Sequence, residues 1–429
     1  MFGGLFCAAL DVGKVTQKTK RRKQAKREKP TFKKPGSNTP KPTARKARRA
    51  QNHAAGRDVP IAPDVPRPKR CAGQYGPLRY ASDCSGIESA VVALEILGCA
   101  PSEHLWASDS YAPCRAILGH NFEIAQVLRD VFETPTPMVQ PDFYTSGFPC
   151  QPYSAQGHRR GATDCRSTPV WAVVDRIARS LPKSFILENV ATLLSPKFNE
   201  IYEVLVGALC NIREKDRRAY DLHVRVLDSQ YHGSPQHRPR VFFVGVLRSC
   251  KTSNFAWPAD LLETPELSTI LDNPKEDEAS WPTNKTELDG IQRAYCAIME
   301  TGADPEAGPW VANVGNGAKF GNQVRSDLLP CLTHARGKTN GFWLFHRSRM
   351  MNIDELSRCQ GFPTGRLQLP PNVHGRSNNV SARQLGGMYG NAMNVCTMAR
   401  IIVRLLPAIG IACHLRDPWC DASIPADCL

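Results

Sequence analysis

The chain has 429 residues, 41% of them hydrophobic, and a formal net charge of +15. This length allows one large core and a smaller lobe, no apolar run approaches the roughly 18 residues that cross a bilayer, and the first ten residues lack the basic start of a secretory signal. The 16 cysteines show no paired CxxC spacing, which predicts reduced thiols in an intracellular protein without a structural metal site.

The positive charge is concentrated at the start of the chain. Residues 1–72 hold 11 Lys and 9 Arg against 4 acidic residues, a net charge of +16, while residues 73–429 have a net charge of −1. Because little apolar content accompanies this charge, residues 1–74 are predicted to form a disordered basic arm. We expect the arm to bind a polyanion, most simply nucleic acid. Its KRRK run also fits a nuclear-import signal, and the alternative is a solvated tail that only aids solubility.

From about residue 75 the composition becomes globular. Residues 78–98 predict a short strand, a tight turn that contains Ser85, Gly86 and Ile87, and an amphipathic helix. A unit of this kind places backbone N–H groups and the positive end of a helix beneath a ligand. The turn is therefore a candidate cofactor site, although many α/β proteins begin in the same way.

Two further strands bring acidic residues to the same region. Residues 104–122 predict a strand that ends at Asp109, followed by a helix, and residues 127–132 predict a third short strand that contains Asp130. In dinucleotide-binding folds an acid at the place of Asp109 accepts hydrogen bonds from both ribose hydroxyls. A helix cap is the alternative role. The residues alone indicate an adenosine-containing cofactor.

A cysteine follows the next predicted strand, residues 141–147. Pro149 and Pro152 keep Cys150 out of helical structure, so it is expected in a rigid loop. Ligands collect at the carboxyl ends of strands in α/β sheets, which makes this thiol a candidate nucleophile. The glycine-rich cationic residues 155–166 are predicted to be a mobile flap over a polyanion. A buried structural cysteine is the alternative.

Two later segments supply candidate partners for this thiol. A predicted helix at residues 167–181 leads into an apolar strand that stops at Glu188 and Asn189. An acid that closes a buried strand is partly desolvated, so the pKa of Glu188 is expected to rise, and this residue is a candidate general acid. A helix cap is the alternative.

Residues 219–247 predict two strands joined by a turn. Arg238 and Arg240 fall on the same face of the second strand, because side chains alternate along a strand. Two adjacent guanidiniums suit the recognition of an anion or a carbonyl group, and a solvated edge is the alternative.

The motifs GFPCQPYS (147–154), ENV (188–190) and QHRPR (236–240) together resemble those of the cytosine-5 DNA methyltransferases. The resemblance extends over residues 78–406. It implies an α/β, Rossmann-like S-adenosylmethionine-dependent methyltransferase fold with a smaller target-recognition lobe. The expected parts are the arm (1–74), a catalytic and cofactor-binding domain (75–247), the recognition lobe (248–349) and a C-terminal segment that returns to the catalytic domain (350–429).

The resemblance also implies roles for individual residues. The Cys150 thiolate would add to C6 of a flipped-out cytosine, Glu188 would interact with N3, and Arg238 and Arg240 would orient the base while C5 receives the methyl group. The expected S-adenosylmethionine-binding residues are Ser85, Gly86, Ile87, Asp109, Asp130 and Asn391. No metal is expected.

The chain departs from the family pattern at three places. Cys84 stands where an aromatic residue is usual, Glu88 replaces a second glycine, and Asn394 and Val395 replace a proline soon after Asn391. The first departure removes the aromatic ring expected to stack on the cofactor adenine.

The last part of the chain is similar to the final motifs of the family. Residues 350–363 predict a capped helix ended by Gly361. Residues 383–406 predict a Gly-Asn turn followed by a long apolar helix, and this helix would bring the end of the chain back to pack against its first strand.

The expected partner is double-stranded DNA, bound through the active-site cleft, the recognition lobe and the basic arm, with no membrane contact. The arm favours a nuclear protein of a eukaryote. Methylation of tRNA on the same scaffold, a non-catalytic DNA-binding protein, and a microbial or viral restriction-system partner are the alternatives. Target sequence and oligomeric state do not follow from the residues.

Overall fold

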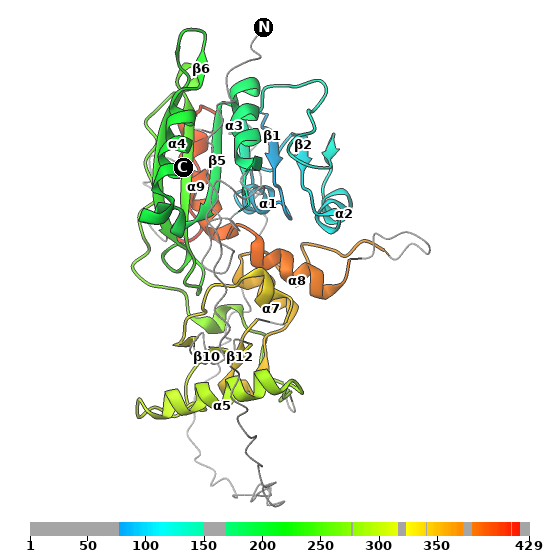
Figure 1. Cartoon of the computed structure of the whole chain (residues 1–429), viewed down its shortest axis with the longest axis vertical. Helices are drawn as coiled ribbons and strands as arrows, with labels where there is room; N and C mark the ends of the chain where they lie inside the picture. The colour runs from blue at the N-terminus through cyan, green and yellow to red at the C-terminus, as the bar shows by residue number, and fades with distance from the viewer. Residues whose placement is uncertain are drawn as a thin grey trace, which may run out of the picture. The chain divides into compact units, whose positions relative to one another are not determined.

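A computed structural model of the chain describes residues 77–149, 168–275, 278–315, 323–339, 341–371, 380–412 and 414–420. Within these residues there are two main sheets, each with helices packed against it (Figure 1). The predicted basic arm, the predicted loop and flap from Cys150 to Arg166, and residues 316–322 lie outside the described residues. No helix in the described ranges is long and apolar enough to cross a membrane.

The larger sheet has seven strands in the order β3-β2-β1-β4-β5-β9-β8. Its strands are β1 (Arg79–Asp83), β2 (Glu103–Ser108), β3 (Val127–Leu128), β4 (Phe143–Ser146), β5 (Ser184–Val190), β8 (Tyr220–Asp228) and β9 (Pro239–Leu247). The first five are parallel, and β9 runs antiparallel between β5 and β8. The chain leaves β1 toward β2 on one side and later enters β4 on the other. The strand order therefore reverses at β1 and β4, and in open α/β sheets ligands bind at the carboxyl ends of such strands.

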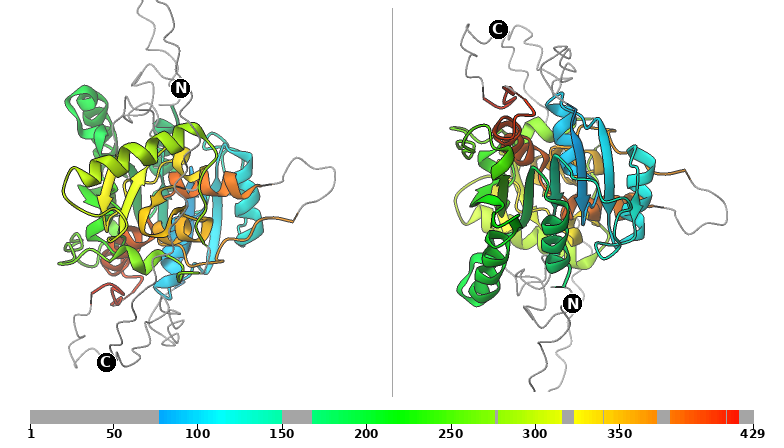
Figure 2. Two further views of the ribbon diagram at one scale, coloured as in Figure 1. Left: turned by 90° about the horizontal axis from the view of Figure 1, so that it is seen from below. Right: turned by 90° about the horizontal axis from the view of Figure 1, so that it is seen from above.

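Both faces of this sheet are apolar, as expected for parallel strands covered on each side. Tyr80 and Phe143 belong to one buried cluster, while their neighbours Ala81 and Tyr144 belong to another on the opposite face. The first cluster includes residues of α1 (Ser89–Ile96), α2 (Ala112–Asn121) and α9 (Val395–Ala408), and the second includes residues of α3 (Thr168–Ser180) and α4 (Asn199–Cys210). Figure 2 shows the helices on either side of the strands.

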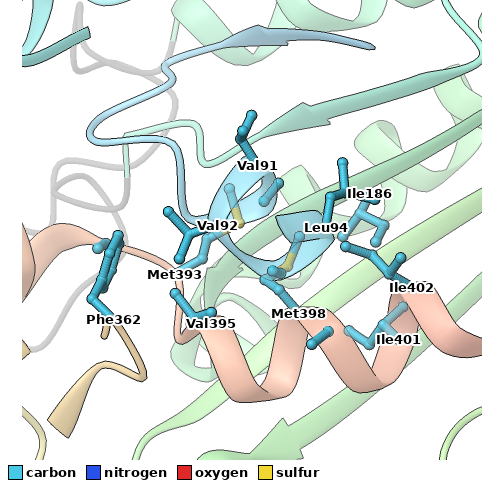
Figure 3. Packing of buried hydrophobic residues seen from close by; sticks show 14 of the residues in the cluster. Val91, Val92, Leu94, Ile186, Phe362, Met393, Val395, Met398, Ile401 and Ile402 are labelled. Carbon is cyan, nitrogen blue, oxygen red and sulfur yellow. The ribbon is translucent and has the colours of Figure 1, made fainter. Parts of the chain in front are cut away.

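Helix α9, late in the chain, packs against helix α1, which follows the first strand of the larger sheet. Leu94 of α1 lies beside Met398 and Ile402 of α9, and Ile186 of β5 is close to them (Figure 3). Burying an aliphatic side chain of this size contributes about 1.5–3 kcal/mol, so this contact is a large part of the core. The last helix was expected to pack against the first strand; α9 packs on α1, the helix that follows that strand.

The smaller sheet lies in the predicted recognition lobe and is antiparallel. Its order is β11 (Gln323–Ser326), β10 (Trp310–Asn313), β12 (Trp343–Leu344) and β13 (Arg349–Met350). Helix α5 (Lys285–Met299) covers it, because Ile291 and Ile298 pack with Ala312 and Trp343 in a separate small core. The other strands and α-helices of the described residues are the hairpin β6 (Arg213–Glu214) and β7 (Arg217–Arg218) and the helices α6 (His334–Gly337), α7 (Ile353–Cys359) and α8 (Ala382–Asn391), and short 3-10 helices connect several elements.

Helix α7 confirms the predicted capped helix. Asn352 and Glu355 form a reciprocal capping box at its N-terminus, and Gly361 follows it with φ +82°. The predicted Gly-Asn turn near residue 390, in contrast, is wrong, because these residues belong to α8.

The glycines of α8 serve close packing. Ser381 and Gln384 cap the helix, and a Cβ atom at Gly386 or Gly390 would overlap the backbone of Gly337 or Thr333. The helix therefore approaches α6 backbone to backbone, which only glycine permits.

We expect Gly390→Ala to destabilise the fold by about 1–3 kcal/mol, because the added methyl group would force α8 away from the Thr333 carbonyl group. The free energy of unfolding from chemical denaturation measures this effect. Gly207→Ala is the matched control, since it lies within α4 and an added Cβ meets no atom within 4 Å. That change is expected to stabilise the chain by up to about 1 kcal/mol. Equal destabilisation by both changes would contradict the packing argument.

Candidate active site

The turn after β1 is open on the side where a ligand would lie. Gly86 has φ +58°, and a Cβ added there would meet no atom within 4 Å. Its N–H donates to Asp109 Oδ2 at 2.9 Å, while Ser85 Oγ accepts from the N–H of Ser108 at 3.0 Å. Ile87 is 1% exposed and belongs to the core, so this residue can offer a ligand only its backbone.

The two predicted cofactor acids lie near this turn. Asp109 accepts from Gly86 and also from the N–H of Tyr111 at 2.8 Å, and burial raises the pKa of its carboxyl group. Asp130 Oδ1 accepts from the N–H of Phe132 at 2.8 Å. Burial, followed by the charges of Asp109 and other acids including Asp130, raises the pKa of the Cys84 thiol well above its usual range. The structure thus brings Asp109 and Asp130 close to Cys84.

Asn391, the remaining predicted cofactor residue, is exposed at the end of α8. The start of the same helix reaches the turn region, because Gln384 Nε2 donates to Tyr111 Oη at 3.3 Å. An open glycine turn with two nearby carboxylates fits the ribose hydroxyls and the amino group of an adenosine-containing cofactor.

Glu188 lies within β5, which continues to Val190, so the predicted end of this strand at Glu188 and Asn189 is wrong. The strand is longer because it pairs with β9 through Val190 and Arg240. This register makes Glu188 and Arg240 diagonal neighbours on one face, with Arg240 Nε 3.0 Å from Glu188 Oε1. Glu188 is 7% exposed. Burial raises the pKa of its carboxyl group, and the guanidiniums of Arg240 and Arg238 offset only part of this effect.

Cys150 lies outside the described residues, but the chain is placed up to Pro149. Asn189 is fully buried and its Nδ2 donates to the carbonyl oxygen of Phe148 at 3.2 Å. The residue next to Glu188 therefore holds the backbone two positions before Cys150. Both segments leave neighbouring parallel strands, which pair through Ser146 and Leu187.

Arg238 is 1% exposed and directed at backbone groups. Its Nη1 donates to Leu332 O at 2.7 Å and its Nη2 to Ala392 O at 2.6 Å, and both donate to Gly390 O at 3.3 Å. Burial and the charge of Arg240 lower the pKa of this guanidinium. Arg238 thus ties the start of β9 to the residues after α8 and before α6.

Cys331 is a member of this cluster that sequence reasoning missed. Its Sγ accepts hydrogen bonds from Arg240 Nη2 at 3.5 Å and from Arg238 Nη1 at 3.6 Å. Nothing in the local sequence marks this thiol, because the contacts form only when the end of the smaller lobe folds against β9.

A family model described as C-5 cytosine-specific DNA methylase matches residues 78–406. The chain belongs to this family.

The Type II methyltransferase M.HaeII of Haemophilus aegyptius is 26% identical over 321 residues, which cover 73% of this chain and 93% of that protein. M.HpaII of Haemophilus parainfluenzae is 31% identical over 240 residues, covering 52% and 62%. The crystal structure of the S. pombe Dnmt2 methyltransferase matches with a TM-score of 0.51 at 17% identity, covering 78% of this chain and 99% of that chain.

These comparisons confirm the predicted family and the Rossmann-like methyltransferase fold. This cytosine-5 DNA methyltransferase is an enzyme whose family implies S-adenosylmethionine as methyl donor and DNA as substrate. No cluster of metal-binding side chains occurs among the described residues.

The structure explains how this methyltransferase tolerates Glu88 in place of a glycine. Glu88 keeps the left-handed backbone that glycine favours, with φ 59°, at a cost of about 1–3 kcal/mol. Its carboxylate points into the core, where Tyr80 Oη donates at 2.9 Å, Ser82 Oγ also donates, and His104 Nε2 lies 3.4 Å away. These contacts offset the strain, and the side chain leaves the cofactor edge of the turn open.

A pocket of about 290 Å³ lies beside the cluster formed by Glu188, Arg238, Arg240 and Cys331. It is lined by His237, Asn313, Gln323, Val324, Arg325, Pro330, Cys331 and Thr333. Cys331 and His237 belong to the Arg238 side of the pocket, while the amide and guanidinium groups come from β10 and β11. The pocket therefore connects the smaller sheet with the residues around Glu188.

Proposed function

We propose that this enzyme methylates C5 of a cytosine that is flipped out of duplex DNA, with Cys150 as the nucleophile and Glu188 as the acid at N3. The hydrogen bond from Asn189 to the Phe148 carbonyl carries this proposal. It links the residue beside the acid to the backbone two positions before the thiol, so that one pyrimidine ring at this strand edge can contact both groups.

The chemistry requires both groups because C5 of cytosine is a weak nucleophile. Addition of the Cys150 thiolate to C6 moves the electrons of the C5–C6 double bond into the ring toward N3, where Glu188 donates its proton. C5 then has enamine character. S-adenosylmethionine, when bound, would supply the electrophilic methyl group for C5, and its S–CH3 bond would break to leave S-adenosylhomocysteine. A base next removes the C5 proton, the electrons of that bond expel Cys150 and restore the double bond, and N3 returns its proton to Glu188.

Glu188 is suited to this task because it is buried and its pKa is raised. A protonated carboxyl group can donate to N3, whereas a carboxylate would repel the developing negative charge. Arg240, 3.0 Å from Oε1, fixes the orientation of the carboxyl group. Arg238 would support the site indirectly, because its hydrogen bonds hold the backbone of Leu332, Gly390 and Ala392 in place.

A base inside a duplex cannot reach these groups, so the target cytosine must leave the stack. We place the reading of its sequence neighbours at the pocket beside Cys331. Asn313, Gln323 and Arg325 offer amide and guanidinium groups there, and side chains of these types form paired hydrogen bonds with base edges.

The substrate is tested by incubating the purified full-length chain with labelled methyl donor and either duplex DNA or tRNA. We expect label in DNA, and bisulfite sequencing should place it at C5 of cytosine. Label in tRNA alone would overturn the choice of substrate. Failure to bind S-adenosylmethionine by calorimetry would instead indicate a non-catalytic DNA-binding protein.

Cys150→Ser is expected to lower methyl transfer at least about a thousand-fold, because the hydroxyl is a far weaker nucleophile than the thiolate. Its DNA affinity should stay within about twofold, as measured by fluorescence anisotropy. Cys296→Ser, at an exposed thiol of α5, is the matched control and should keep full activity. Retained turnover by the Cys150 variant would contradict the nucleophile assignment.

A further inference from the structure

Cys331 is held in place by the segment around it. Leu329 N–H donates to Pro235 O at 2.8 Å, His237 N–H donates to Leu329 O at 2.9 Å, and Leu332 N–H donates to Gln236 Oε1 at 2.9 Å. Leu329 therefore forms an isolated parallel bridge with Gln236, in the segment that precedes β9. This pairing fixes the sulfur of Cys331 between two guanidiniums.

The sulfur of Cys331 lies among charged groups. Arg240 Nε is 3.0 Å from Glu188 Oε1, and the guanidiniums of both Arg240 and Arg238 act on the Glu188 carboxyl group. The nearby thiol of Cys359 is neutral, because burial raises its pKa well above the usual range. His237 pairs with Asp228, with His237 Nδ1 2.6 Å from Asp228 Oδ2. The Cys331 sulfur contacts both guanidiniums, at 3.5 Å from Arg240 Nη2 and 3.6 Å from Arg238 Nη1, so a negative charge on it would act on both.

Two arrangements of the thiol compete. As a neutral thiol, Cys331 donates to Leu332 O at 3.7 Å, which is a long and weak contact. As a thiolate, it accepts from both Arg240 and Arg238, and hydrogen bonds between ionised groups are stronger. Burial alone would raise the pKa of this thiol, but the two guanidiniums outweigh it and the pKa is lowered.

We propose that Cys331 is a thiolate positioning residue that balances Arg238 and Arg240, and so allows Glu188 to keep the proton that it donates to cytosine N3. The inference rests on the proposed role of Glu188. A thiolate at position 331 partly offsets the electrostatic effect of the two guanidiniums on Glu188. Without it, the full charge acts on Glu188 and favours its carboxylate form.

The ionisation of Cys331 is tested by the thiolate ultraviolet absorbance of the full-length protein across pH. The difference between wild type and Cys331→Ser reports this sulfur alone and requires no access for a reagent. We expect the difference to appear at least one pH unit below the corresponding difference for Cys296→Ser. Coincident curves would overturn the proposal, and this readout does not depend on any methyl transfer.

The coupling to Glu188 is tested by the pH dependence of kcat/KM on duplex DNA for Cys331→Ser, Cys331→Ala and Cys331→Asp. Activity requires a protonated Glu188, so a lower Glu188 pKa moves the alkaline loss of activity to lower pH. For Cys331→Ser and Cys331→Ala we expect the alkaline loss of activity to move to lower pH. At a pH on this alkaline limb, kcat/KM should be about tenfold below the wild-type value. The anionic Asp should restore the wild-type profile. Rescue by Ser with failure of Asp would show a merely structural role and overturn the proposal.

Inactive wild-type enzyme would refute the proposed function, whereas active enzyme with an unshifted alkaline limb in both neutral variants would refute the role of Cys331 alone.

Discussion

Glu188→Gln is expected to lower kcat for methyl transfer to DNA by about 10²–10⁴-fold. The amide has the shape of the protonated carboxyl group and can donate a hydrogen bond to N3, but it cannot release a proton. Negative charge then accumulates on the ring as Cys150 adds. Single-turnover methyl transfer measures the loss, and calorimetry should show unchanged binding of S-adenosylmethionine, because its predicted residues follow β1, β2 and β3 or, for Asn391, end α8.

The pH dependence gives this prediction its sign. Burial raises the pKa of Glu188, and the active form is protonated, so wild-type activity should fall as pH rises through that raised pKa. The Gln variant has no group to titrate there and should lack this limb. Glu103→Gln, at an exposed carboxylate of β2, should match the wild type. A Glu188→Gln enzyme with near-normal kcat and an unchanged alkaline limb would exclude the acid role.

Arg238→Ala is expected to destabilise the fold by about 3–5 kcal/mol. The change leaves the carbonyl oxygens of Leu332, Gly390 and Ala392 without their buried donor, and each unsatisfied buried group costs about 1–3 kcal/mol. A cavity adds to the cost. The midpoint of chemical denaturation measures the loss.

Arg238→Lys separates charge from geometry. Lysine keeps the positive charge but lacks the planar fork that reaches three carbonyl groups together, so it should recover only part of the stability. Arg129→Ala, at a side chain that is 80% exposed, should change stability by less than about 0.5 kcal/mol. If the Arg238 and Arg129 variants unfold at the same denaturant concentration, the buried arginine does not hold these segments together.

The sequence was sufficient to predict what depends on local pattern and strand order. Asp109 and Asp130 follow parallel strands, and the carboxyl ends of such strands meet at one edge, so their proximity to the Gly86 turn was foreseeable. The neighbourhood of Glu188 and the segment before Cys150 followed from the same rule. The pairing of Glu188 with Arg240 required the register of β5 on β9, which the residue pattern alone did not specify.

The features that were not predicted depend on contacts between distant segments. Gly386 and Gly390 are residues typical of a turn, yet they lie in helix α8. Glycine is needed there because the backbone of α6 and of the residue before it packs directly against this helix. Glu88 stands where a glycine was expected, yet its carboxylate is buried in the core and accepts hydrogen bonds from the hydroxyl groups of Tyr80 and Ser82. Cys331 contacts its two guanidiniums because Leu329 and Leu332 form hydrogen bonds with residues 235–237, which precede β9.

The packing of α9 on α1 has a consequence for how the polypeptide matures during synthesis. Until residues 395–408 have left the ribosome, the apolar face of α1 has no cover and the nascent domain exposes a surface that favours aggregation. The smaller lobe, encoded between β9 and α9, is therefore made while the parent domain is still incomplete, and a chain stopped before α9 should be a substrate for chaperones.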